Sequence, residues 1–213
     1  MTVTFLGDAA VSATMTDADP LAANARVHRV AAAVRAARVP GVRDVVPGMR
    51  ELVVHVDPRQ CDVPELERVL QESAAREPGG DVAPAQVIEV PVRYGGDDGP
   101  DLTSVAAACG LHADDVCARH AAAEYVVCFV GFLPGFPYMG PLEPALHLPR
   151  RRSPRPSVPA GSVAIAGGYT GIYPWSSPGG WHLIGRTGFK LFDLGNEAPA
   201  ALLPGTRVRF VVR

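Results

Sequence analysis

The sequence predicts two domains: a small α+β domain over residues 1–85, of the split-βαβ or ferredoxin-like type, and a mostly-β domain over residues 86–213, built as a closed barrel or a sandwich. Composition changes between them: residues 1–85 hold 7 of the 21 prolines and 5 of the 22 glycines, and residues 86–213 hold the other 14 and 17. Hydrophobic periodicity alternates between strand and helix in the first part. In the second part, short β-branched runs lie between Gly/Pro turns, which is typical of barrels and sandwiches.

Helix and strand signals in the first domain follow the order β-α-β-β-α-β. Asp19 followed by Pro20 predicts the start of a helix, and Pro40-Gly41 predicts its end. A second helix is expected over residues 64–75, capped by Asp62. The predicted strands cover residues 3–6, 42–46, 51–56 and 86–92, and segment 76–84, with two prolines and two glycines, is predicted to be a linker.

The second domain is predicted to begin with two short helices, over residues 102–109 and 113–120. A β-branched and aromatic run at 124–131 predicts a buried strand. Further short strands are expected at 162–166, 181–184, 189–193 and 208–212. Residues 131–188 contain 11 glycines and 10 prolines, so turns and loops dominate this region.

Composition excludes several classes of protein. Apolar residues make up 47% of the chain and charged residues 20%, with a mean hydropathy of +0.11, which argues against intrinsic disorder. A net charge of −2 argues against a general nucleic-acid or membrane-surface binder. There is no signal-peptide pattern and no apolar run long enough to span a membrane. The four cysteines form no CxxC pair and no zinc-ligand spacing, so we expect a cytoplasmic protein with reduced thiols and no metal.

A first dense motif directly follows the predicted strand at 124–131. Proline restricts φ and glycine permits close backbone approach, so the motif predicts a stiff loop that presents aromatic rings. Two interpretations are open: a packed loop that closes the barrel end, or the apolar wall of a ligand or partner site. The structural residues of this loop are Gly131, Phe132, Pro134, Gly135, Phe136 and Pro137, with Tyr138 after them.

Two further motifs carry the other candidate groups. Arg150, Arg151, Arg152 and Arg155 form a basic run, either a solvated loop or a carboxylate or phosphate site. Residues 161–174 predict strand, glycine-rich turn and strand, without the pattern of a nucleotide phosphate loop. Residues 177–187 combine a turn at Pro178, Gly179 and Gly180 with a strand that contains Trp181 and Arg186.

No complete catalytic constellation is visible in the sequence. There is no GxSxG, HExxH or paired-carboxylate motif. We therefore expect a protein that binds as part of a larger enzyme, or a site completed by another chain.

Several long segments resemble one family, named variously KipI, allophanate hydrolase subunit 1 and the B component of 5-oxoprolinase (PxpB). They read VGFLPGFPYMG, PRRRSPRPSVPAGSVAIAGG, TGIYPWSSPGGWHLIGRT and PGTRVRF, and the match extends back through IEVPVRYGGDDGPDL, ARHAAAEYVV and VVPGMRELVVHVDP. The resemblance implies a cyclophilin-like barrel for the second domain. It also implies a partner of the allophanate hydrolase subunit 2 family (KipA-like, or PxpC) and a PxpA-like protein, which together open 5-oxoproline to L-glutamate with ATP as co-substrate.

The resemblance suggests contact residues but no catalytic residue. Matching positions proposed to bind substrate or partner are Tyr138, Arg150, Arg155, Gly167, Gly168, Thr170, Tyr173 and Arg186. We expect an arginine to bind the lactam carboxylate and N–H groups of the glycine-rich turn to polarise a carbonyl or bind phosphate. The sequence departs from the family pattern at Tyr169 and His182, where glutamine is usual.

The leading hypothesis is thus one component of an ATP-dependent 5-oxoprolinase that is active only in a complex. Alternatives are a regulatory protein that inhibits a sensor histidine kinase and a component of a urea- or allophanate-related amidohydrolase or carboxylase. The barrel alone would also permit a prolyl isomerase, but fold does not imply function. We expect a small lactam or amide substrate and no nucleic-acid or membrane partner.

Overall fold

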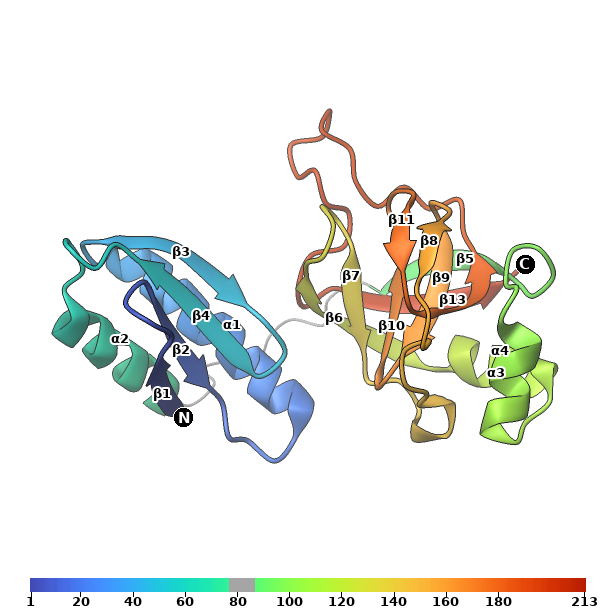
Figure 1. Cartoon of the computed structure of the whole chain (residues 1–213), viewed down its shortest axis with the longest axis horizontal. Helices are drawn as coiled ribbons and strands as arrows, with labels where there is room; N and C mark the ends of the chain where they lie inside the picture. Colours follow the sequence, from blue (N-terminus) through green and yellow to red (C-terminus); the bar gives the residue numbers. More distant parts are fainter. Residues whose placement is uncertain (77–86) are drawn as a thin grey trace. The chain divides into compact units, whose positions relative to one another are not determined.

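The computed structural model describes residues 1–76 and 87–213. The chain divides into two compact units, Met1–Ala83 and Pro84–Arg213, coloured from blue to green and from green to red in Figure 1. Most of the predicted linker, residues 77–84, lies outside the described residues. None of the helices in the described ranges is both long and apolar enough to cross a membrane.

The first unit is a four-stranded antiparallel sheet with two helices on one face (Figure 1). Its elements are β1 (Thr2–Phe5), β2 (Ala10–Thr14), α1 (Pro20–Ala37), β3 (Val42–Pro47), β4 (Glu51–Val56) and α2 (Val63–Ala75), with the strands in the spatial order β1-β2-β4-β3. The Asp19 carboxylate accepts the N–H groups of Leu21 and Ala22, and Asp62 accepts that of Glu65, so both predicted helix starts are confirmed.

The predicted strand order of this unit is wrong in two elements. The observed order is β-β-α-β-β-α, because β2 was missed and the predicted strand at 86–92 belongs to the other unit. The sequence of β2, Ala-Val-Ser-Ala-Thr, has one strongly β-prone aliphatic residue, yet its first four residues are buried in the middle of the sheet. Tertiary burial thus overrides a weak local preference, and the split-βαβ, ferredoxin-like type is not confirmed.

The second unit is a closed barrel of seven strands, as the sequence predicts for this half. Around the barrel the order is β10-β7-β6-β13-β5-β12-β9, and a separate two-stranded ribbon pairs β11 with β8. The strands are β5 (Val87–Tyr94), β6 (Glu124–Val130), β7 (Pro137–Gly140), β8 (Arg155–Val158), β9 (Ser162–Ala166), β10 (Tyr169–Ile172), β11 (Ser177–Gly179), β12 (His182–Arg186) and β13 (Arg207–Val212). The pair of β13 and β5 is parallel, and the other barrel pairs are antiparallel.

Two helices, α3 (Leu102–Cys109) and α4 (Ala113–Ala122), and the short 3-10 helix η1 (Pro144–Leu146) complete this unit. The barrel interior is a continuous apolar core in which Val92, Tyr125 and Phe210 pack with residues of α3 and α4. The closed barrel is confirmed, whereas its cyclophilin-like classification stays a prediction.

The prediction of a strand at residues 189–193 is wrong. This segment makes one isolated bridge, between Phe192 and Ala200, and otherwise forms a loop. The Asp193 carboxylate accepts the N–H of Gly195 at 2.9 Å and pairs with Lys190. Local side-chain hydrogen bonds of this kind compete with strand pairing, and they organise the loop here.

Candidate aromatic site on the barrel wall

A second apolar cluster lies on the outer face of the barrel wall. Along β9, Val163 and Ile165 belong to the barrel core, whereas Ala164 and Ala166 belong to a separate cluster with Phe136. This alternation follows from the two-residue period of a strand, which places successive side chains on opposite faces. The outer cluster also contains Val158, Tyr173, Trp181 and Leu183.

The loop after β6 covers this outer cluster. Gly131 N–H donates to Phe136 O at 3.2 Å and Phe136 N–H donates to Leu133 O at 3.0 Å, so the loop closes on itself. Phe132 has a φ of +70°, which a bulky residue rarely adopts, and its side chain remains 60% exposed. Gly135 has a φ of +79°, and a Cβ there would lie 2.9 Å from the Cβ of Phe192. The loop is therefore a fixed structure that holds an aromatic ring at the surface.

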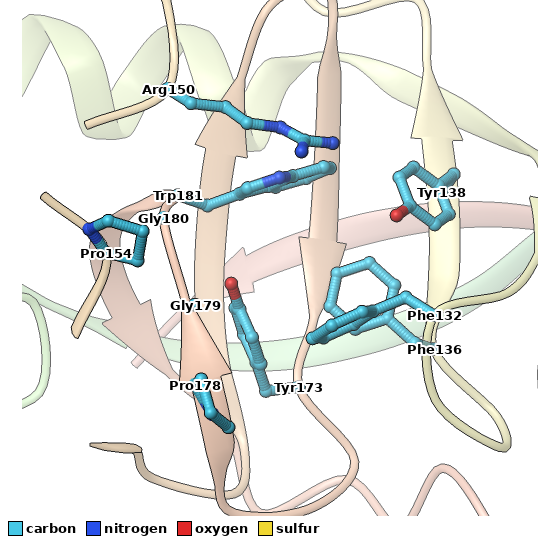
Figure 2. A pocket seen from close by; sticks show the side chains of 10 residues that line it. All are labelled: Phe132, Phe136, Tyr138, Arg150, Pro154, Tyr173, Pro178, Gly179, Gly180 and Trp181. Carbon is cyan, nitrogen blue, oxygen red and sulfur yellow. The ribbon is translucent and has the colours of Figure 1, made fainter. Parts of the chain in front are cut away.

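An aromatic cavity of about 250 Å³ lies beneath this loop (Figure 2). The rings of Phe136 and Tyr173 meet edge to face with centroids 5.1 Å apart, and those of Tyr138 and Trp181 with centroids 5.4 Å apart. A Cβ on Gly179 would lie 2.4 Å from the Tyr173 hydroxyl, so glycine is required beside it. The lining residues are Phe132, Phe136, Tyr138, Arg150, Pro154, Tyr173, Pro178, Gly179, Gly180 and Trp181.

A neighbouring cavity of about 400 Å³ shares Tyr138, Arg150 and Trp181 with the aromatic cavity. Its other lining residues are Phe129, Pro149, Ala166, Gly167 and Tyr169. Figure 2 shows the Arg150 side chain extending alongside the Trp181 ring, so this guanidinium belongs to both cavities. Neither lining contains a carboxylate, and Arg150 is the charged side chain in both.

The backbone on both sides of Arg150 is anchored. The His182 Nε2–H donates to Pro149 O at 2.9 Å, and the Arg151 N–H donates to Gly180 O at 2.8 Å. The Arg150 guanidinium itself has no hydrogen-bond or ion-pair partner among the described residues. A fixed backbone with an unpaired guanidinium suits the binding of an anion.

The two tyrosines of the aromatic cavity stay protonated near neutral pH. Burial raises the pKa of Tyr138 and of Tyr173 above the ordinary value, although the charge of Arg150 opposes the shift. Each phenol can therefore donate a hydrogen bond to a ligand.

Arg155 lines neither cavity, because a buried carboxylate binds it. Its Nη1 and Nη2 lie 2.9 and 2.8 Å from the two oxygens of Asp101, and Arg151 Nη1 lies 2.9 Å from the same carboxylate. The Leu183 N–H donates to Asp101 Oδ2 at 2.8 Å. Burial alone would raise the pKa of Asp101, but the Arg155 and Leu183 hydrogen bonds and the arginine charges hold it below its ordinary value. We call this group the Asp101 clamp.

Thr170 is fully buried, on the inward face of β10. Its Oγ1 lies 2.8 Å from His120 Nε2 and donates to Ala164 O at 3.2 Å. The other imidazole nitrogen, Nδ1, lies 2.7 Å from the Tyr94 hydroxyl. The chain of bonds requires a neutral imidazole with its proton on Nε2. Thr170 therefore supports the wall behind the cavities instead of lining them.

The remaining predicted site residues divide between turns and another cavity. Gly167 lines the neighbouring cavity, but its N–H donates to Leu148 O at 2.7 Å and so is not free to polarise a carbonyl. Gly168 lies beside the His147 ring, and Arg186 lines a separate cavity. Of the stiff loop, Phe132 and Phe136 line the aromatic cavity, whereas Gly131, Pro134, Gly135 and Pro137 shape the backbone around them.

Sequence reasoning missed two residues that organise this unit. Asp101 occupies the N-cap position of α3, yet its side chain makes no capping bond and turns to the arginines. His120 lies on α4 at i+4 from the buried Val116, a spacing that signals a buried position. No group of three or more His, Cys, Asp or Glu side chains within the described ranges could hold a metal ion.

Comparison with known proteins gives consistent matches. The family model described as "Carboxyltransferase domain, subdomain C and D" matches residues 1–203. A protein from Escherichia coli O157:H7, named as the B component of 5-oxoprolinase, is 45% identical over 210 residues, covering 97% of this chain and 93% of the relative. A protein of the same name from Bacillus subtilis (strain 168) is 38% identical over 216 residues, covering 97% and 90%.

Solved structures support the fold over nearly the whole chain. The crystal structure of TTHA0988 is 41% identical with a TM-score of 0.81, and the match covers 96% of this chain but only 40% of that longer chain. The K. lactis urea amidolyase matches 99% of this chain and 15% of its own length with a TM-score of 0.83, and at 19% identity this likeness shows the fold alone. The family expected from the motifs is confirmed, and the chain belongs to the carboxyltransferase subdomain C and D family, among the proteins named as the B component of 5-oxoprolinase.

Proposed function

We propose that this chain is the B component of a 5-oxoprolinase complex, which opens 5-oxoproline to L-glutamate with hydrolysis of ATP in the cytoplasm. The complex would contain a PxpC-like protein, of the KipA or allophanate hydrolase subunit 2 type, and a PxpA-like protein. The shared name of the relatives supports this proposal over kinase inhibition, since the Bacillus subtilis relative also carries it. The observation that carries it is the unpaired Arg150 guanidinium in an aromatic, carboxylate-free cavity.

The chemistry of the substrate fits this cavity. 5-Oxoproline is a five-membered lactam ring that bears one carboxylate. A guanidinium can bind a carboxylate through two parallel hydrogen bonds, so the carboxylate of the substrate would bind to Arg150. The flat ring would then lie against the aromatic walls formed by Phe136 and Trp181, and the Tyr138 and Tyr173 hydroxyls would donate to the lactam carbonyl.

The cavity linings lack the groups that would perform the reaction alone. Neither lining contains a serine, cysteine, histidine or carboxylate side chain to serve as nucleophile or general base. The ATP-dependent activation of the lactam and the subsequent attack of water would therefore use groups from a partner protein. The exposed Phe132 ring at the cavity edge is a candidate contact for that partner.

The proposal is tested in the complex reconstituted with the PxpA-like and PxpC-like proteins. Arg150→Gln should raise the KM for 5-oxoproline roughly tenfold or more, because a hydrogen bond to a charged group is lost at the substrate. Arg152→Gln is the matched control, since it removes the same charge from an exposed residue of the same basic run. Lactam-dependent ATP hydrolysis measures both variants. Unchanged kinetics in Arg150→Gln would refute the role of Arg150, and a lack of lactam-dependent ATP hydrolysis in the parent complex would refute the function.

A further inference from the structure

A third cavity, of about 330 Å³, lies at the ends of three neighbouring barrel strands, β12, β5 and β13. It shares no lining residue with the aromatic cavity or its neighbour. Its lining residues are Pro91, Arg93, Arg186, Thr187, Gly188, Phe189 and Arg213, and we call it the arginine cavity.

The arginine cavity brings like charges together. Arg93 and Arg186 are directly opposite each other on the paired strands β5 and β12. Arg213 lies beside them, since its N–H donates to Val92 O at 2.9 Å. Like charges directly opposite on adjacent strands destabilise a sheet. Two guanidinium groups on paired strands and a third from the residue after β13 therefore create a positive potential that an anion would relieve.

One carboxylate partly compensates this charge. Asp98 Oδ2 lies 2.7 Å from Arg93 Nε, and Asp98 Oδ1 lies 3.9 Å from Arg186 Nη1. The Arg213 guanidinium has no ion-pair partner among the described residues. The three guanidinium groups thus face one carboxylate side chain, and several of their N–H donors remain available.

Two further groups of the lining can donate hydrogen bonds. The Thr187 Oγ1 accepts the Phe189 N–H at 3.0 Å, which leaves its own hydroxyl hydrogen free to donate. Gly188 is an exposed residue, and its N–H has no hydrogen-bond acceptor among the described residues. A lining rich in hydrogen-bond donors favours a ligand whose polar atoms are all acceptors. The two parallel N–H groups of a guanidinium match the spacing of two phosphate oxygens. Pro91 and Phe189 add an apolar wall.

We propose that the arginine cavity binds an oxyanion of the phosphate class with two or more negative charges, either free phosphate or the phosphoryl group of an organic molecule. Phosphate oxygens would accept from Arg93, Arg186 and the Gly188 N–H. The site is separate from the aromatic cavity, so it does not depend on the proposed substrate role of Arg150.

The test uses the isolated full-length chain, without its proposed partners, in isothermal titration calorimetry at constant ionic strength. Inorganic phosphate, ATP and succinate are titrated separately. We expect phosphate and ATP to bind more tightly than succinate. Tighter binding of ATP than of phosphate assigns the site to phosphorylated organic molecules, and equal binding assigns it to free phosphate.

Two variants test whether the anion binds in the arginine cavity, one expected to weaken binding and one expected to strengthen it. Arg186→Gln should weaken binding roughly tenfold, and Asp98→Asn should strengthen it because a competing carboxylate is removed. Arg209→Gln, which removes an exposed charge of β13 paired with Glu124, should leave binding unchanged. Absence of phosphate and ATP binding, or an equal loss in Arg186→Gln and Arg209→Gln, would overturn the proposal. Circular dichroism confirms that each variant is folded.

Discussion

Arg150 and Arg155 belong to one short basic run, yet the barrel uses them in opposite ways. The Arg155 guanidinium is bound by both oxygens of a carboxylate whose side chain is 5% exposed. The Arg150 guanidinium faces two cavities and meets no carboxylate there. The difference shows that one short run of arginines can contain both a guanidinium held by a buried carboxylate and a guanidinium that faces a cavity.

Among the ion pairs of the barrel unit, breaking the Asp101 clamp should have the largest effect on stability. Asp101→Asn leaves two arginines without their shared carboxylate. We expect the free energy of unfolding to fall by about 3 kcal/mol. This value is at the lower end for a broken buried ion pair, because both guanidinium groups keep some access to water. Both tryptophans, Trp175 and Trp181, lie in the barrel unit, so their fluorescence during urea unfolding follows this unit alone. Asp193→Asn, which breaks an exposed pair with Lys190, should lower the free energy of unfolding much less, because water screens that pair. Equal losses in the two variants would contradict the structural role of Asp101.

His120 should make the barrel unit sensitive to mild acid. Burial lowers the pKa of His120 to about 3, from 6.5 for the unburied group. Between these values the unfolded chain binds a proton that the folded chain does not, so stability falls as the pH falls below 6.5. The free energy of unfolding should be about 2 kcal/mol lower at pH 5 than at neutral pH, because each pH unit below 6.5 costs about 1.36 kcal/mol. Tryptophan-monitored unfolding from pH 7 to pH 5 measures it, and His120→Gln should flatten this part of the profile. An unchanged slope in His120→Gln would refute the assignment.

Phe132 should contribute little to stability despite its size. Phe132→Gly removes a largely exposed ring but also relieves a positive φ, which costs a non-glycine residue about 1–2 kcal/mol. We expect the free energy of unfolding to stay within about 1 kcal/mol of the parent. The buried Phe136 is the contrast, since Phe136→Ala should cost about 3–5 kcal/mol. If the ring of Phe132 contacts a partner protein, Phe132→Gly should nevertheless weaken co-purification with the PxpC-like protein.

Arg150→Gln should have the smallest effect on stability. Its guanidinium has no partner in the described part of the chain, so the free energy of unfolding should change by less than about 0.5 kcal/mol. The same variant should weaken lactam binding by the reconstituted complex. A large loss of stability in Arg150→Gln would show that this arginine, like Arg155, is structural.

Local signals in the sequence predicted the helices well and the clamp not at all. Asp19 and Asp62 precede a proline at the first or second helical position and cap their helices as expected. Asp101 is also an N-cap residue, but its carboxylate binds Arg151 and Arg155, which lie 50 and 54 positions further along the chain. Capping is a local interaction, whereas the clamp depends on the closure of the barrel, so a rule based on neighbours in sequence cannot distinguish the two.

The aromatic loop shows the same division. Its glycines and prolines predicted a stiff turn that presents aromatic rings, but they did not predict that Phe136 is buried and Phe132 is exposed. Phe132 also has a positive φ, which its residue type does not predict. The missed strand β2 has a similar cause, because its small residues are strand-forming only when the sheet buries them.

The parallel pair of β5 and β13 joins the first strand of the barrel to the last, with Val87 beside Arg207 (Figure 1). A ribosome must therefore synthesise almost the whole unit before the ring can form, and contacts of such long sequence separation slow folding. Until then, β5 and β6 have exposed edges that can pair with other chains. Chaperone dependence and aggregation of shortened chains are thus expected consequences of how this barrel closes.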